Sequence, residues 1–341
     1  MILDGVPTPI VLAPLAGGPS TPELTAAAGE AGAFAFLAAG YLTRETLRER
    51  IAATRTLTGR PFGVNVFVPG RPTASEAVAA YADLLAVEAE RLGAPLGEPR
   101  FDDDHWQGKV GLLIEEAVPV VSFVFGCPPP ETVHALHDAG SEVWITVTTP
   151  QEAARAEAAG ADVLVAQGVE AGGHRATWDD GDAAIAGFGV LSLVQLLHAR
   201  SELPVVATGG IASGAGIAAV LAVGARAAAL GTAFLRCPEA GTSSVHRVAL
   251  TGTTPTALTR AFTGRTARGI RNRLLDEYTD RAPSAYPEVH NLTAPLRQAG
   301  REQGVADVVN LWAGQTYSLA RELPAGEVVR ELVAELAALS H

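Results

Sequence analysis

The sequence predicts a (β/α)8 barrel, on three observations. Short apolar runs alternate with longer alanine-rich segments of helical periodicity, which is typical of strand-helix units around a parallel sheet. Eight such runs occur, and eight strands close a barrel of this kind. The chain of 341 residues is long enough for one large barrel with an appended subdomain. A doubly wound open sheet is the alternative architecture.

The strands follow from apolar runs bounded by Gly, Pro or polar turn residues. We expect them at residues 9–13, 33–37, 63–67, 118–123, 142–147, 162–166, 203–208 and 227–231. Helix starts between them are well marked. In Thr149-Pro150-Gln151-Glu152, for example, the threonine can cap, the proline fits the first turn and the glutamate can complete a capping box.

Two regions do not fit a minimal barrel. An alanine-rich helix is expected at 75–92, followed by the polar turn FDDDHW. Residues 238–320 have helical patterns with Gly and Pro breaks, and an amphipathic helix follows at 325–339. We therefore expect a barrel over 1–237, a small α-helical subdomain inserted after strand 8 over 238–320 that covers the active site, and a C-terminal helix in 321–341 that packs back on the barrel.

Composition restricts the partners and the compartment. The net charge is −12 and Lys109 is the only lysine, which argues against nucleic acid and against a basic membrane-binding patch. Cys127 and Cys237 have no metal-ligand spacing, which fits a reducing compartment. The first residues lack a charged leader and prolines break their apolar run, so we expect a cytoplasmic protein.

Glycine turns follow the last two strands. Gly209 and Gly210 end strand seven, and Gly231 with Thr232 ends strand eight. In such barrels the loops after these strands commonly bind phosphate through backbone N–H groups and a helix end. The glycines would let the backbone approach the anion. The alternative is a pair of ordinary tight turns.

Two amides stand at the ends of apolar strands. Asn65 in FGVNVF and Gln167 in VLVAQ carry both donors and an acceptor, which suits the edge of a heteroaromatic ring such as a flavin pyrimidine. The stretch APLAGG, with Pro14 and Leu15, offers a backbone wall for such a ring. With the phosphate turns, the amides predict a phosphorylated planar cofactor. The alternative is a hydrogen bond between strands in the barrel core.

His174 stands behind two glycines in GVEAGGHR, on the loop after strand six. Its imidazole titrates near neutral pH and can act as a general base or donate to an anionic substrate. A structural hydrogen bond is the alternative role. Glu170 and Arg175 are expected to be scaffold or rim contacts, and no histidine pair has the spacing of a metal site.

The sequence resembles the nitronate monooxygenase family, and most of all its bacterial class I members. The resemblance spans nearly the whole chain, and its motifs are fairly specific when taken jointly. They are APLAGGPSTPEL, PFGVNVF, AQGVEAGGHR, TGGIASGAGIAAVLAVGARAAALGTAF, FTGRTARGIRNR and LWAGQ.

The resemblance implies an FMN-dependent TIM barrel that oxidises alkyl nitronates with molecular oxygen to carbonyl compounds and nitrite. Propionate 3-nitronate and nitroalkanes are the expected substrates, and the protein is expected to be a monomer or homodimer. His174 would take a proton from a neutral nitroalkane or bind the anionic nitro group. The residues expected to bind FMN are Pro14, Leu15, Asn65, Gln167, Gly172, Gly173, Gly209, Gly210, Ala229, Leu230, Gly231 and Thr232.

Three positions depart from the family pattern. Leu15 stands where many members have Met, a change of similar volume that should leave the backbone wall intact. Ala229 stands where many have Gln, which removes one side-chain contact to the cofactor. Val124 stands where some members have His, which leaves open the strength of anion binding and the substrate preference.

Other functions are weighed against this one. Flavin-dependent enoyl-acyl-carrier-protein reductases, which use NAD(P)H, share EAGGH, but they tend to carry Glu at the position of Gln167 and lack the WAGQ segment. A non-catalytic FMN-binding protein and a phosphosugar enzyme without flavin are the further alternatives.

Overall fold

Eight parallel strands close into a barrel in the order β1, β2, β3, β4, β5, β6, β8, β9. The computed structural model describes residues 1–73, 75–181 and 187–339. All eight expected strands are confirmed to within a few residues, and the open sheet is wrong because β1 pairs with both β2 and β9. The strands span Ile10–Leu12, Phe34–Ala38, Phe62–Phe67, Val120–Val124, Glu142–Val147, Val163–Gln167, Val205–Thr208 and Ala227–Leu230.

Helices surround the barrel and several begin as expected. Thr149 accepts a hydrogen bond from Glu152 N at 3.1 Å and caps α6. Glu152 does not close a capping box, because its Oε2 accepts from Thr148 N instead, at 2.6 Å. The helices are α1 (Pro22–Glu30), α2 (Arg44–Leu57), α4 (Trp106–Glu115), α5 (Pro130–Asp138), α6 (Pro150–Ala158), α7 (Val190–His198) and α8 (Gly214–Ala222), with 3-10 turns η1 (Ile2–Gly5) and η3 (Thr232–Phe234).

The barrel interior is filled unevenly. Phe34, Phe36 and Trp144 form an aromatic cluster with ring centroids 5.2–5.4 Å apart. Strand β9 contributes only the small side chains of Ala227 and Ala229 to this inner core. Because side chains alternate along a strand, the remaining apolar residues pack outward against the helices. The small residues leave a cavity that reaches down to Phe36 and Trp144.

The segment after the barrel is not purely helical. Residues 238–320 include the strands β10 (Thr256–Thr259) and β11 (Ala267–Ile270), which pair antiparallel. Strand β11 also pairs with β7 (Gly173–His174), on the loop after β6. Each of these strands has only four residues and lacks the continuous apolar run of a barrel strand, so the sequence pattern did not reveal them. The other elements are α9 (Ser244–Ala249), α10 (Arg273–Tyr278), η4 (Thr279–Arg281), α11 (Glu288–Gln303), η5 (Ala306–Val308) and η6 (Tyr317–Leu319).

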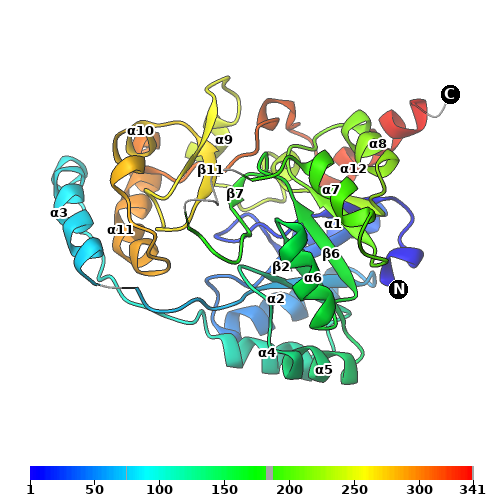
Figure 1. Cartoon of the computed structure of the whole chain (residues 1–341). Helices are drawn as coiled ribbons and strands as arrows, with labels where there is room; N and C mark the ends of the chain where they lie inside the picture. Colours follow the sequence, from blue (N-terminus) through cyan, green and yellow to red (C-terminus); the bar gives the residue numbers. More distant parts are fainter. Residues whose placement is uncertain (74, 182–186, 340–341) are drawn as a thin grey trace.

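Two expected helices connect distant parts of the chain. Helix α3 (Ser75–Leu92) packs on α11, away from the barrel (Figure 1). Helix α12 (Ala325–Ala338) packs against α1 and α8 and so joins the first and last barrel helices. We propose that α3 and 238–320 form one subdomain, while 321–339 belongs to the barrel. Among the described residues, no helix has the length and hydrophobicity to cross a membrane.

A buried ion pair fixes the loop after β2. Lys109 is completely buried, and its Nζ lies 2.7 Å from Asp104 Oδ2. Asp104 Oδ1 accepts a hydrogen bond from Tyr41 N at 2.9 Å. Tyr41 has φ +67°, a left-handed conformation that costs energy for any residue with a Cβ. The FDDDHW turn therefore holds Tyr41 in place, at the wall of the cavity.

Replacing the single lysine tests this arrangement. Lys109→Met should lower the free energy of unfolding by about 3–5 kcal/mol, because Asp104 would remain buried without its cation. The double variant Asp104→Asn/Lys109→Met should recover much of that loss, as measured by urea unfolding. Equal losses in the single and double variants would contradict the ion-pair explanation.

Candidate active site

A cavity of about 520 Å³ lies at the carboxyl ends of the barrel strands. Twelve predicted site residues line it. Leu230 is the exception: its side chain points outward into the core beneath the helices, because Ala229 before it faces inward. The lining residues are Pro14, Leu15, Asn65, Gln167, Gly172, Gly173, His174, Gly209, Gly210, Ala229, Gly231 and Thr232.

Asn65 has one free polar atom. Its Nδ2 donates to Ser122 Oγ at 2.9 Å and to Ser122 O at 3.3 Å, so the amide does bond across strands. Its Oδ1 has no hydrogen bond to any residue that the structure describes, and the side chain borders the cavity. This acceptor is available to an N–H group of a ring in the cavity.

Gln167 holds the backbone around His174. Its Oε1 accepts from Ala176 N at 2.8 Å and from Arg175 Nη1 at 3.0 Å, and its Nε2 donates to His174 O at 3.1 Å. The amide was expected to face a cofactor edge. Although it borders the cavity, most of its hydrogen-bonding capacity orients the loop, because that loop turns back over the end of β6.

Glu170 and Arg175 are scaffold residues, as expected. Arg175 is 1 % exposed, and its Nη1 donates to Gly168 O at 2.8 Å besides Gln167. Burial lowers the pKa of Arg175 to about 10, so it remains a cation at neutral pH. The carboxylate of Glu170 accepts from Val190 N at 3.1 Å, at the first residue of α7.

The glycines serve two different needs. Gly209 and Gly210 have φ +113° and +69°, which only glycine adopts readily, so their turn can present backbone to the cavity. Gly172 instead permits a close crossing, because a Cβ there would lie 2.4 Å from Gly314 N. That crossing brings the WAGQ segment to Thr232, whose Oγ1 accepts from Gly314 N at 3.0 Å.

His174 stands among aromatic rings. The centroids of Phe125, Tyr286 and Trp312 lie 5.5–5.7 Å from its own. Its Nε2 lies 2.9 Å from Thr263 Oγ1. Desolvation, and then the positive charges of Arg265 and Arg297, lower the pKa of His174 to about 3. The imidazole is therefore neutral at neutral pH, with the rings shielding it from water.

An arginine of α11 also faces the cavity, and the sequence reasoning missed it. Arg297 is 5 % exposed, and its donors reach His290 O at 2.9 Å and Thr293 Oγ1 at 3.0 Å. No carboxylate forms an ion pair with it within the described chain. The sequence does contain a signal for a buried arginine, because Arg297 falls on the apolar stripe of α11 with Thr293 and Leu296.

The residues present fit a phosphorylated planar cofactor. His246 is 8 % exposed, it borders the cavity, and its Nε2 has no hydrogen-bond partner among the described residues. A buried polar atom without a partner is costly unless a ligand meets it. Together with the free Oδ1 of Asn65 and the Gly209-Gly210 turn, it provides polar contacts at separate places of the cavity wall. No cluster of His, Cys, Asp or Glu suited to a metal ion occurs in the described part of the chain.

Barrel and site together define an enzyme whose cavity takes a cofactor at the carboxyl ends of parallel strands. The family model described as nitronate monooxygenase matches residues 3–335. The chain belongs to this family. It is 43 % identical over 354 aligned residues to a nitronate monooxygenase of Pseudomonas aeruginosa, covering 98 % of this chain and 97 % of the relative.

Solved structures agree with this assignment. The nitroalkane oxidase of Streptomyces ansochromogenes superposes with a TM-score of 0.97 at 51 % identity, covering 99 % of this chain and 98 % of that one. FabK of Thermotoga maritima is more distant, with a TM-score of 0.77 at 26 % identity, covering 99 % and 95 %. FabK is thus a weaker match than the nitroalkane oxidase in both sequence and shape.

The lowered pKa of His174 predicts how stability depends on pH. The pKa is about 3 in the folded protein, against 6.5 for a free histidine, so the unfolded chain binds the extra proton between these values. The free energy of unfolding should therefore fall as the pH drops from 6.5 to 3, by up to about 1.4 kcal/mol per pH unit from this residue. Urea unfolding of His174→Asn should show a shallower dependence, and parallel curves for the two proteins would contradict the lowered pKa of His174.

Proposed function

We propose that this enzyme binds FMN and uses molecular oxygen to oxidise alkyl nitronates to carbonyl compounds and nitrite. Propionate 3-nitronate and nitroalkanes are the proposed substrates. One observation carries the proposal: in a chain of this family, a neutral histidine borders the same cavity as an arginine that has no carboxylate partner in the described part of the chain. These groups suit a small anion that forms by loss of a proton.

FMN is the proposed form of the flavin that enzymes of this family use. The flavin, when bound, supplies the electron transfer that the amino acids cannot. Asn65 and Gln167 would meet its ring edge, and Pro14 with Leu15 would line its face. The remaining cofactor residues named above border the same cavity, with Gly209 and Gly210 as the phosphate turn. Leu230 is left out because its side chain faces the helices.

Arg297 would hold the anionic substrate. A buried cation without a counter-ion is costly, and an anion entering the cavity removes that cost. Its guanidinium is fixed by His290 O and Thr293 Oγ1, so little side-chain freedom is lost on binding. A nitronate carries its negative charge on two oxygens, which match the planar donors of arginine.

His174 would act on substrates that arrive as neutral nitroalkanes. A general base must be unprotonated at the working pH, and the lowered pKa leaves the imidazole of His174 neutral there. The same shift weakens it as a base, and the charge of Arg297 on the forming nitronate would offset that loss. The surrounding rings of Phe125, Tyr286 and Trp312 keep water from competing for the imidazole. For a preformed nitronate, the same residue would serve as a hydrogen-bonding group.

The setting of the enzyme is proposed on sequence grounds alone. Net negative charge and the two cysteines without metal spacing favour a cytoplasmic protein with small molecules as partners. A monomer or homodimer is the proposed assembly.

An absorption spectrum of the purified protein, followed by addition of a nitronate in air, tests this function. Flavin bands, release of FMN on denaturation and nitronate-dependent oxygen uptake without a nicotinamide coenzyme are expected. Flavin bleached only by NADPH, with enoyl reduction, would assign the reductase activity instead. Flavin bands with neither activity would leave a binding protein, and a colourless protein that does not take up FMN would favour the phosphosugar alternative.

Removing the charge of Arg297 should weaken binding of the anion. Arg297→Gln is expected to raise KM for a nitronate roughly tenfold or more, since a charged hydrogen bond is lost. KM for the neutral nitroalkane should rise less. Arg330→Gln, at an exposed position of α12, is the matched control. Steady-state oxygen uptake measures both constants, and equal effects on the two substrates would contradict an anion-binding role.

A further inference from the structure

The hydroxyl of Thr263 makes three polar contacts at the base of His174. Its Oγ1 lies 2.9 Å from His174 Nε2, 3.3 Å from Arg265 O and 3.4 Å from Arg265 N. Thr263 lies between β10 and β11 and is 1 % exposed, so water does not replace these contacts. They must be satisfied among the protein groups themselves.

The protons can be counted. A backbone N–H only donates, a carbonyl only accepts, and a hydroxyl has one proton and two lone pairs. All three contacts are hydrogen bonds only when Thr263 donates to Arg265 O and accepts from both Arg265 N and His174 Nε2. If the hydroxyl donated to Nε2 instead, two oxygens would face each other at 3.3 Å without a proton between them.

We propose that Thr263 is a positioning residue that holds His174 in the tautomer protonated on Nε2. The lone pair of a neutral imidazole then lies on Nδ1, which has no hydrogen bond to any described residue. The consequence rests on the proposed function: in the reaction, Nδ1 is the atom of His174 that takes the proton from the substrate. The C–H bond of the nitroalkane breaks, its electron pair moves into the nitro group, and an N–H bond forms on Nδ1. The proton on Nε2 stays on the Thr263 hydrogen bond throughout.

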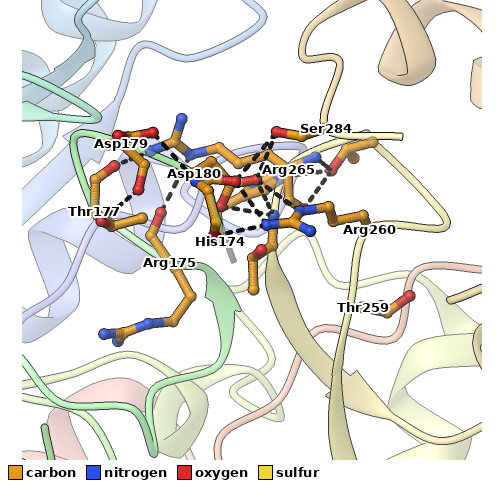
Figure 2. A network of polar contacts seen from close by, with 12 residues as sticks. His174, Arg175, Thr177, Asp179, Asp180, Thr259, Arg260, Arg265 and Ser284 are labelled. Carbon is orange, nitrogen blue, oxygen red and sulfur yellow. Dashed lines mark hydrogen bonds and ion pairs between the residues drawn. The ribbon is translucent and has the colours of Figure 1, made fainter. Parts of the chain in front are cut away.

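Arg265, two residues after Thr263, belongs to a polar network with the loop of His174 (Figure 2). Arg265 Nε donates to Arg175 O at 3.2 Å, and its Nη2 donates to Thr177 O. The Arg265 guanidinium also covers the ring of Phe125, with Cζ 4.0 Å from the centroid. These contacts flank His174 along its own loop and fix the spacing between Oγ1 and Nε2.

Asp180 completes this network from the far end of the loop. Its carboxylate accepts from Thr266 N at 3.0 Å and forms an ion pair with Arg260 at 3.1 Å. Ser284 Oγ donates to Asp180 O at 3.2 Å. The turn that carries Thr263 is thus tied to the loop of His174 at several points, which is what a geometrically exact hydrogen bond requires.

Two variants of Thr263 distinguish the effect of its hydroxyl group from the effect of its side-chain volume. Thr263→Val keeps the volume and removes the hydroxyl, whereas Thr263→Ser keeps the hydroxyl. The measurement is kcat/KM for nitroethane divided by kcat/KM for its preformed nitronate, in the FMN-loaded enzyme. The valine variant should lower this ratio roughly tenfold or more, because only nitroethane must lose a proton. The serine variant should restore the ratio. An unchanged ratio in the valine variant would overturn the proposal.

A second measurement does not depend on turnover. Nitrogen NMR shifts of 15N-histidine, assigned by comparison with His174→Asn, show which ring nitrogen carries the proton. The proposal expects a protonated Nε2 and an unprotonated Nδ1 in the wild-type protein, and a protonated Nδ1 would overturn it. If the wild type oxidised neither nitroethane nor the nitronate, the proposed function would fail, and the NMR shifts would still decide the tautomer.

Discussion

The backbone pairing of β7 with β11 is the contact on which the site depends. Strand β7 is two residues long and carries His174, which lies opposite Ala267 in the ladder. The next residue continues the connection, since Arg175 N donates to Thr266 O at 2.8 Å. The barrel alone would leave this loop at its open rim. The pairing joins it to the subdomain, so Thr263 and the aromatic rings can surround the imidazole.

The positive charge of buried arginines near the cavity determines its chemistry. Arg297 is buried and has no carboxylate partner among the described residues, and the charges of both Arg265 and Arg297 act on His174. Both oppose protonation of the imidazole, and both favour an incoming anion. The same charges that keep the histidine available as a base therefore also attract the product of deprotonation.

Close backbone crossings decide where glycines are needed. At Gly172 a Cβ would meet Gly314 N at 2.4 Å, so the WAGQ segment can lie against the histidine loop only if residue 172 has no side chain. Gln315 N then donates to Glu170 O at 3.0 Å. A glycine that resembles a cofactor contact in the sequence thus serves first to bring two loops together.

The sequence by itself determined the barrel, because strand length, turn glycines and helix caps are local signals that need no distant partner. It also placed Asn65, Gln167 and His174 on one rim, since parallel strands bring their carboxyl ends to the same side. The alternation of side chains along β9 already predicts that Leu230 points outward, whereas the family resemblance implies a cofactor contact at this residue.

Only the tertiary structure decided what surrounds the histidine. Thr263 is 89 residues from His174 in the chain, and the rings of Phe125 and Tyr286 come from two other parts of it. The hairpin β10–β11 was not predicted because its strands have only four residues each, and the pairing of β11 with β7 joins segments that are far apart in the chain. Which nitrogen of His174 carries the proton, and which charges lower its pKa, depend on packing between segments that no local pattern connects.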